Sequence, residues 1–214
     1  HPARRAALQQ LARELLQSSM SVDMDGSSPG ETVPAEHFKF LLVPLGIPNA
    51  VATLGANVAI TESVIAHVLS ENGLAMVLAH EIAHVQLRHP IEAAGRGIVI
   101  QVALTAVLGS SGNSLLGGSL GTGGLLTMLS FNREMELEAD RRALAILRQH
   151  YGHTAGADEF FIEMEKMQGS GDWLEFTRTH PDTERRLEII RSEMGRDATH
   201  VDTRPLPGAL HAGG

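Results

Sequence analysis

Cysteine is absent from this 214-residue chain, which excludes disulfides, thiol catalysis and thiolate metal sites. Any metal site must therefore use His, Asp or Glu. The formal net charge is −8 and no basic block is longer than ARR, so we expect no nucleic-acid partner, because such partners need a cationic face. Hydrophobic residues make up 43% and charged residues 20%, the balance of a globular domain with a substantial core.

A signal peptide, an initiator Met and an internal repeat are also missing, so we expect a trimmed form with a signal or anchor removed upstream. Long apolar runs are scarce. The most apolar stretch, residues 97–129, has two arms around a Gly/Ser-rich middle, and its first arm has about half of the ~20 residues that a spanning helix needs. A lid or interfacial hairpin is therefore favoured there, with a membrane contact or a partner site as alternatives.

The remaining pattern predicts a single α+β domain over residues 1–214 that is mainly helical, with a small mixed sheet or hairpin. Two or three short strands are expected between residues 37 and 64, with LGAN as a turn. Ser70 can cap the next helix and Pro90 can mark its end. Further helices are expected near residues 1–20, 131–150, 155–168 and 180–194, the last with Pro181 in its first turn. A loop is expected around Trp173 and a loose tail over about 197–214.

The segment LAHEIAHVQLRHP contains the pattern H-E-x-x-H. On a helix, His80 and His84 lie one above the other, ~6 Å apart along the axis, which suits two imidazoles that bind one ion. Glu81 borders this site, where it can hold a water on the ion and take its proton. A chain of this composition contains the pattern by chance roughly once in twenty-five, so histidines that satisfy core hydrogen bonds are the alternative. Arg88 and His89 are interpreted as partners in structural ion pairs.

The segment NREMELEADRRA supplies two candidates for a third ligand. Glu136 and Asp140 stand at the same helical spacing as the two histidines. One carboxylate can complete a His₂Glu site, while the other accepts a hydrogen bond from the far nitrogen of a ligand histidine and fixes its tautomer. The alternative is a solvated acidic helix face.

Together these segments resemble the HtpX-like zinc metallopeptidases, which include the CAAX prenyl endopeptidases and the mitochondrial Oma1-like enzymes. The resemblance covers most of the chain from about Asn49 to Arg191 and rests on NAVATLGANVAI, LAHEIAHVQLRHP, NREMELEAD and THPDTERRLEII, in that order. It implies a zincin-type fold of the gluzincin class with one zinc ion per chain. It also implies that Glu136, not Glu134 or Glu138, is the third ligand, and that Asp140 is the supporting carboxylate.

The resemblance implies a role for two further residues. His180 would lie near the metal and either stabilise the tetrahedral intermediate or cap the zinc in a latent state, and Arg186 would anchor its loop. The stretch NAVATLGA departs from the family pattern, NAFALPGG, because the Pro is lost and only Gly55 of the glycine pair remains. The strand edge from Val51 to Leu54 would pair with an extended polypeptide substrate.

We therefore predict a zinc-dependent endopeptidase with His80, His84 and Glu136 as ligands and Glu81 as general base. The resemblance implies misfolded or envelope proteins as substrates, and a periplasmic or membrane-associated location in a bacterial cell envelope. One alternative is a metal-stabilised, chaperone-like adaptor that binds apolar segments through residues 97–129 and rarely cuts them. Another is an integral-membrane protease that cuts within or beside the bilayer.

Overall fold

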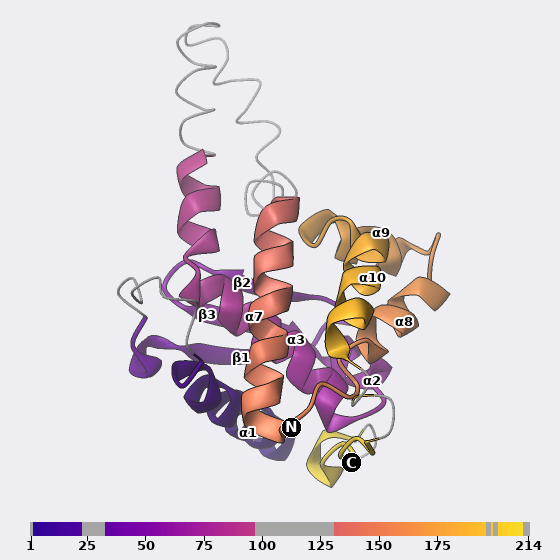
Figure 1. Cartoon of the computed structure of the whole chain (residues 1–214). Helices are drawn as coiled ribbons and strands as arrows, with labels where there is room; N and C mark the ends of the chain where they lie inside the picture. Colours follow the sequence, from indigo (N-terminus) through magenta and orange to yellow (C-terminus); the bar gives the residue numbers. More distant parts are fainter. Residues whose placement is uncertain (1, 23–32, 97–130, 196–197, 199–200, 212–214) are drawn as a thin grey trace, which may run out of the picture.

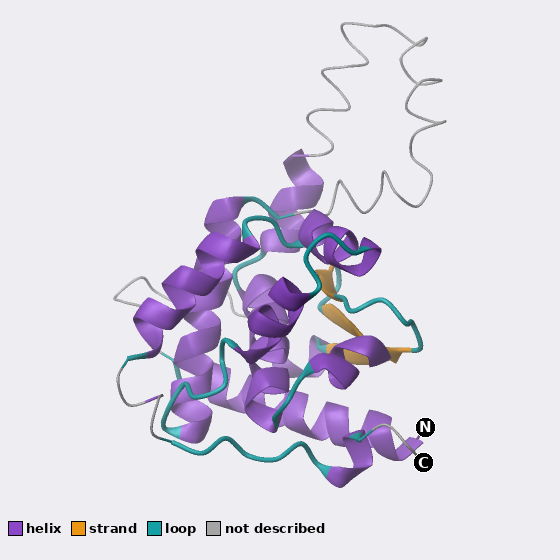
Figure 2. Ribbon diagram, turned by 90° about the vertical axis from the view of Figure 1, so that its right-hand side faces the viewer, coloured by secondary structure: helices purple, strands orange, loops and turns teal. Residues whose placement is uncertain are grey.

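The computed structural model describes residues 2–22, 33–96, 131–195, 198 and 201–211. Helices dominate, and a three-stranded sheet lies at one side of the helical body (Figures 1 and 2). This confirms the predicted α+β, mainly helical class. The elements are α1 (Pro2–Met20), η1 (Ala35–His37), β1 (Lys39–Val43), β2 (Ala50–Thr53), β3 (Asn57–Thr61), α2 (Glu62–His67), α3 (Glu71–Gln86), α7 (Arg133–Tyr151), α8 (Glu159–Lys166), α9 (Gly171–Thr179), α10 (Thr183–Met194) and η3 (Gly208–Leu210).

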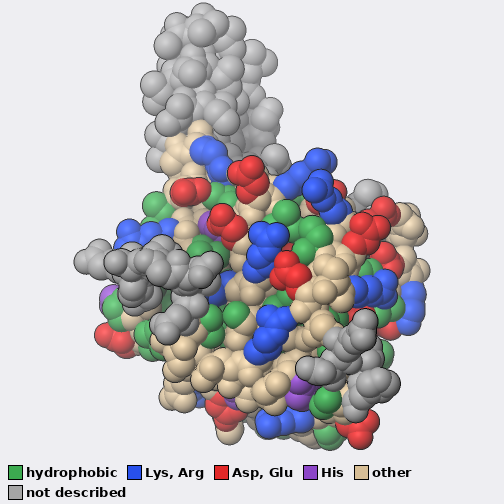
Figure 3. Space-filling view, viewed as in Figure 1, with side chains coloured by type: hydrophobic (Ala, Val, Ile, Leu, Met, Phe, Trp, Pro, Cys, Tyr) green, Lys and Arg blue, Asp and Glu red, His purple; other side chains and the backbone are tan. Residues whose placement is uncertain are grey.

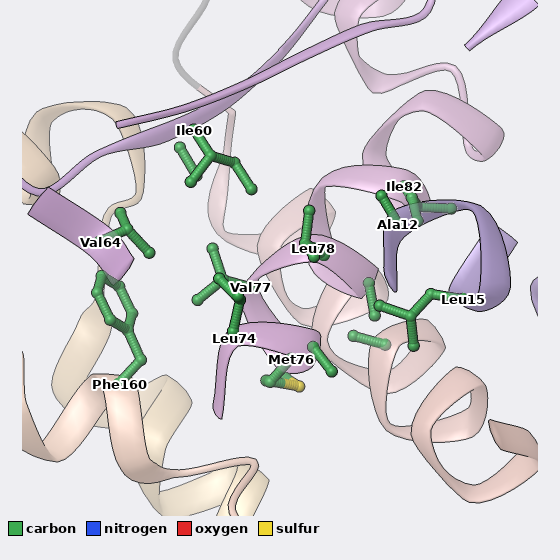
Figure 4. Close-up of a cluster of buried hydrophobic side chains, with 14 of the residues drawn as sticks. Ala12, Leu15, Ile60, Val64, Leu74, Met76, Val77, Leu78, Ile82 and Phe160 are labelled. Atoms are coloured by element: carbon green, nitrogen blue, oxygen red, sulfur yellow. The ribbon is translucent and has the colours of Figure 1, made fainter. Parts of the chain in front are cut away.

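Helix α3 runs through the centre of the core. Every residue of it from Asn72 to Val85 is buried, so other elements cover the helix on all sides. Side chains of the sheet, α2 and α8 pack on one side of it, and side chains of α1 pack on the other (Figure 4). Its most extensive packing is against α7. As predicted, Ser70 caps the helix, because its hydroxyl accepts a hydrogen bond from the Gly73 N–H at 3.0 Å.

The sheet has the strand order β1-β3-β2, with β1 parallel and β2 antiparallel to β3. The β2–β3 turn forms although the family's second glycine is missing, because Ala56 adopts a left-handed φ of 57° beside Gly55 at 76°. The N–H of Thr61 donates to Asn49 O at 2.9 Å, so the alternation of an antiparallel pair turns the backbone groups of Ala50 and Ala52 away from β3. These groups face α3 and the polar residues described below.

The structure corrects three local predictions. Helix α3 ends at Gln86, not at Pro90, and Pro90 lies in the first turn of a second helix over residues 89–96. The segment around Trp173 is helix α9 and not a loop. Pro181 precedes α10 and is not part of its first turn, because the helix begins at Thr183 after Asp182, which has a left-handed φ of 63°.

The described part of the C-terminal segment also differs from the expected loose tail. Leu206 and Leu210 are buried in the main core, and η3 packs against α1. The guanidinium of Arg4 donates to His211 O at 2.7 Å. The apolar stretch over residues 97–129 lies outside the described residues. Among the helices that are described, none has the length and apolar character that crossing a membrane requires.

Acidic and basic side chains are interspersed on the face of the molecule seen in Figure 3. Ion pairs at the surface link some of the elements, such as that of Arg141 on α7 with Glu193 on α10 at 3.1 Å. Exposed pairs of this kind contribute only about 0–1 kcal/mol to stability. The arrangement of α3, α7 and α10 therefore rests on their buried faces.

Candidate metal centre

Four polar side chains from three parts of the chain converge between α3, α7 and α10. The Nε2 atoms of His80 and His84, one turn apart on α3, are 2.8 Å from each other. Glu136 on α7 places Oε1 3.3 Å from His84 Nε2 and Oε2 3.5 Å from His80 Nε2. His180, in the connection between α9 and α10, joins them, and one donor atom of each lies within 4.8 Å of the others. The structure thus brings together His80, His84 and Glu136, as predicted.

The outer nitrogen of His80 faces a buried ion pair. His80 Nδ1 is 2.9 Å from Asp140 Oδ1, and Arg186 donates to both oxygens of Asp140 at 2.7 Å. The same guanidinium contacts Glu136 Oε2 and lies 5.1 Å from the centre of the Phe161 ring. Burial raises the pKa of Asp140, but the charge and hydrogen bonds of Arg186 outweigh burial and hold it below its usual value. Arg186, expected only as a loop anchor, therefore pairs with two carboxylates of α7, those of Glu136 and Asp140.

The outer nitrogen of His84 faces a different set of residues. Its Nδ1 is 2.8 Å from Nδ1 of His89, whose Nε2 is 3.3 Å from Glu138 Oε2. The ring of Phe131 stacks on that of His84, with centroids 3.8 Å apart and planes 16° apart. Burial lowers the pKa of both histidines. Sequence reasoning missed Phe131 and Glu138, and it assigned His89 only an ion pair.

Charged groups around His80 and Glu136 set their protonation. Burial lowers the pKa of His80 and so does Arg186, but the charge of Asp140 and the hydrogen bonds that Asp140 and Glu136 accept raise it to about 9. Burial raises the pKa of Glu136, but Arg186 and His180 hold it well below its usual value. Glu136 is therefore ionised, and His80 in the metal-free protein carries a proton that a metal ligand has to lose.

Glu81 and His180 lie against the outward edge of β2. The Ala52 N–H donates to the Glu81 carboxylate, and burial raises the pKa of that carboxyl. His180 Nε2 donates to Ala50 O at 2.9 Å and lies 3.6 Å from Glu81 Oε1, while its Nδ1 is 3.2 Å from Glu136 Oε2. Burial lowers the pKa of His180, but the charge of Glu136 outweighs it, so the pKa is raised. His180 can thus act as a metal ligand or as a proton donor.

A cavity of about 20 Å³ borders Glu81 and His180. The rings of Phe160, Phe161 and Phe176 form much of its wall. This volume is the space open to the centre of a water molecule, and roughly 10–15 Å³ of it is enough for one water, so the cavity has room for one. One water can therefore lie within reach of the Glu81 carboxylate.

The donor set fits a divalent metal ion. Glu81 Oε2 and Glu136 Oε1 are buried without a hydrogen-bond partner among the described residues, and buried oxygens of that kind need one. Tetrahedral coordination at 2.0–2.1 Å places neighbouring donors about 3.4 Å apart. The observed separations among His80, His84 and Glu136 are 2.8 Å, 3.3 Å and 3.5 Å. Imidazole and carboxylate donors suit zinc and similar ions.

Two histidines one helical turn apart, a glutamate next to the first and a carboxylate from a second helix define a metallopeptidase. The chain belongs to peptidase family M48, whose sequence profile matches residues 7–194. This confirms the predicted resemblance and the predicted class of metallopeptidase, which acts on polypeptides.

Two individual relatives are also named as proteases. The chain is 37% identical over 147 residues to the mitochondrial metalloendopeptidase OMA1 of Schizosaccharomyces pombe, covering 67% of this chain and 42% of that protein. It is 31% identical over 171 residues to the beta-barrel assembly-enhancing protease of Escherichia coli, covering 74% of this chain and 35% of that protein. The chain thus spans less than half the length of these curated relatives.

Proposed function

We propose that residues 1–214 form the catalytic domain of a zinc-dependent endopeptidase. His80, His84 and Glu136 would hold the zinc ion, Glu81 would act as general base and Asp140 would orient His80. The observation that carries the proposal is the convergence of both imidazole Nε2 atoms and the Glu136 carboxylate within 3.5 Å, next to the unpartnered Glu81 Oε2. A chaperone-like adaptor is not favoured, because it has no use for a buried carboxylate beside the metal ligands.

When bound, zinc supplies a Lewis acid that polarises the scissile carbonyl and activates water. Glu81 Oε2 takes the proton from the attacking water in the adjacent cavity and delivers it to the leaving amine. Burial favours the first transfer, because it raises the pKa of Glu81 and so stabilises the protonated carboxyl that holds the proton until the second transfer. His180 would donate a hydrogen bond to the developing oxyanion, or serve as a fourth ligand in a latent state.

The substrate would be an extended polypeptide added as a strand to the outer edge of β2. The backbone groups of Ala50 and Ala52 on that edge pair with His180 and Glu81 when no substrate is present. A substrate strand would take over these backbone groups and bring its scissile bond to the side chains that they release. Misfolded or envelope proteins as substrates, and a periplasmic or membrane-associated location, are part of the proposal; in support, one relative is named a beta-barrel assembly-enhancing protease.

The test compares the wild-type chain with Glu81→Gln. Elemental analysis should find one zinc per chain in both proteins, because Glu81 is not a ligand. Digestion of a peptide library should be slower in Glu81→Gln by about 10²–10⁴-fold, the contribution of a general base. Glu134→Gln, an exposed glutamate on α7, is the control and should cleave at the wild-type rate. Equal cleavage by Glu81→Gln would overturn the mechanism, and a wild-type chain that retains no zinc would overturn the site.

A further inference from the structure

We propose that His89 is a positioning residue for the ligand His84, and that Glu138 in turn positions His89. The three side chains would form a hydrogen-bonded relay that fixes the proton of His84 on Nδ1 and leaves Nε2 free for the metal. This inference rests on the proposed function of the site. It assigns a task to His89 beyond the structural ion pair expected from sequence.

The distances allow one consistent placement of the protons. His84 Nε2 faces His80 Nε2 at 2.8 Å and Glu136 Oε1 at 3.3 Å, so the metal would be bound on that side of the ring. The proton of a neutral ring must then be on Nδ1, which is 2.8 Å from Nδ1 of His89. His84 Nδ1–H therefore donates a hydrogen bond to His89 Nδ1. Because His89 Nδ1 is the acceptor, the proton of the neutral His89 ring is on its Nε2.

Glu138, the third member of the relay, accepts a hydrogen bond from the Nε2 proton of His89. His89 Nε2 is 3.3 Å from Glu138 Oε2, and a carboxylate can only accept. His89 is 2% exposed, whereas the Glu138 side chain is 59% exposed, so the relay runs from the buried centre to the surface. Phe131, stacked on His84 at 3.8 Å, holds the plane of the ring whose tautomer the relay determines.

The backbone between the two histidines is bent in the way that this contact needs. In an uninterrupted helix, a residue five positions after His84 would lie about 140° away around the axis and could not face it. Here α3 ends at Gln86, and Arg88 adopts a left-handed φ of 61°. A positive φ is uncommon for a residue other than glycine and persists where the surroundings hold it. The bend returns His89 to the outer nitrogen of His84.

A purely structural histidine and a positioning histidine respond differently to two substitutions. His89→Asn keeps an acceptor, because its amide oxygen can take the place of Nδ1, whereas His89→Leu fills similar space with no acceptor. If His89 positions His84, we expect zinc affinity to fall about 10–100-fold in His89→Leu and less than about threefold in His89→Asn. A packing role alone would leave zinc affinity unchanged in both.

Zinc affinity is measured on the metal-free chain by competition with a chromophoric chelator, so the readout does not depend on peptidase activity. Glu138→Ala should lower affinity by about two- to fivefold, because water can replace an exposed acceptor. Glu134→Ala, another exposed glutamate of α7, is its matched control and should change nothing. Equal affinity of the His89→Leu and wild-type chains would overturn the inference while leaving the proposed function intact.

A second measurement decides the question if His89→Leu does not fold. Nitrogen-15 spectra of histidine-labelled, zinc-loaded wild-type protein report which ring nitrogen of His84 carries the proton. We expect the proton on Nδ1, with its resonance shifted in His89→Asn. A proton-free Nδ1 would overturn the relay. If the wild-type chain binds no zinc at all in the chelator competition, the proposed function fails instead.

Discussion

His80 and His84, the two proposed ligand histidines, lie on one helix, yet their outer nitrogens face opposite environments. His80 Nδ1 faces Asp140, a carboxylate that is 1% exposed and paired with Arg186. His84 Nδ1 faces His89, a ring whose pKa burial lowers and whose far side reaches an exposed carboxylate. One side of the centre is thus organised by buried charge, and the other by a neutral ring that leads to solvent.

This difference predicts how substitutions on the two sides affect stability and zinc affinity. Breaking a buried ion pair leaves an uncompensated charge at low dielectric, so every member of the His80 side is needed for the others. A neutral hydrogen bond contributes only about 0.5–1.5 kcal/mol, and an exposed end can be replaced by water. We therefore expect substitutions on the His80 side to lower stability strongly, and substitutions on the His84 side to lower zinc affinity with little loss of stability.

The largest effect should follow from Arg186→Met. It leaves the carboxylates of Asp140 and Glu136 buried with no guanidinium beside them, which should cost about 3–5 kcal/mol of unfolding free energy. Urea denaturation of the metal-free protein measures this. Arg141→Met, which breaks the exposed pair with Glu193, is the control at about 0–1 kcal/mol. Similar losses in the two variants would contradict the contrast between buried and exposed charge.

Asp140→Asn should weaken zinc binding by about 10–100-fold, because the supporting charge behind His80 is removed while the size of the side chain is kept. Chelator competition at pH 8 gives the number. Glu138→Gln, the equivalent change on the His84 side, should lower affinity by less than about fivefold. A larger effect of Glu138→Gln than of Asp140→Asn would reverse the comparison.

The pH dependence of zinc binding should come mainly from the titration of His80. The pKa of His80 in the folded, metal-free protein is about 9, above its ordinary value of 6.5. Protonated His80 therefore stabilises the metal-free protein fully below about pH 6.5, and this stability is lost as pH rises through about 9. Zinc has to displace that proton, so its affinity should rise by up to about tenfold per pH unit over this window.

Calorimetric titration with zinc in buffers of different ionisation enthalpy counts the released protons. Asp140→Asn should flatten the slope, because Asp140 is the main group that raises the pKa of His80. An affinity that is independent of pH between 6.5 and 9 would show that the ring is already neutral in the metal-free protein.

The smallest effect is expected from Phe131→Leu. It removes the ring stacked on His84 and should cost about 1 kcal/mol in thermal unfolding, with only a few-fold loss of zinc affinity. Phe38→Leu, a buried residue of the main core, is the control. It should lower stability by a similar amount and leave zinc affinity unchanged. Equal changes of zinc affinity in both variants would argue against a role of the Phe131 ring in holding His84.

Local features of the molecule could be predicted because they depend on neighbours in the chain. The pairs His80 and His84, and Glu136 and Asp140, share a helix face through spacing alone, and the Ser70 cap uses a residue three positions away. The spacing did not distinguish which carboxylate faces the metal site and which supports it. That distinction came from the family resemblance and agrees with the observed distances.

Features that depend on distant contacts were missed. The end of α3 at Gln86 coincides with the left-handed Arg88, which no propensity rule favours, and it is this bend that brings His89 back to His84. The loop expected around Trp173 is a helix, and the described tail is held by Leu206 and Leu210 in the core. Tertiary packing overrode the local preference in each case.

By itself, the sequence determined the metallopeptidase motif, the helices that carry it and the absence of any thiolate ligand, because each follows from residue type and short-range spacing. Only the tertiary structure decided that Arg186 pairs with Asp140 behind His80, and that His89 and Glu138 lie behind His84. Those partners come from separate segments, and packing of the elements around α3 brings them together. No periodic pattern in the sequence predicts these contacts.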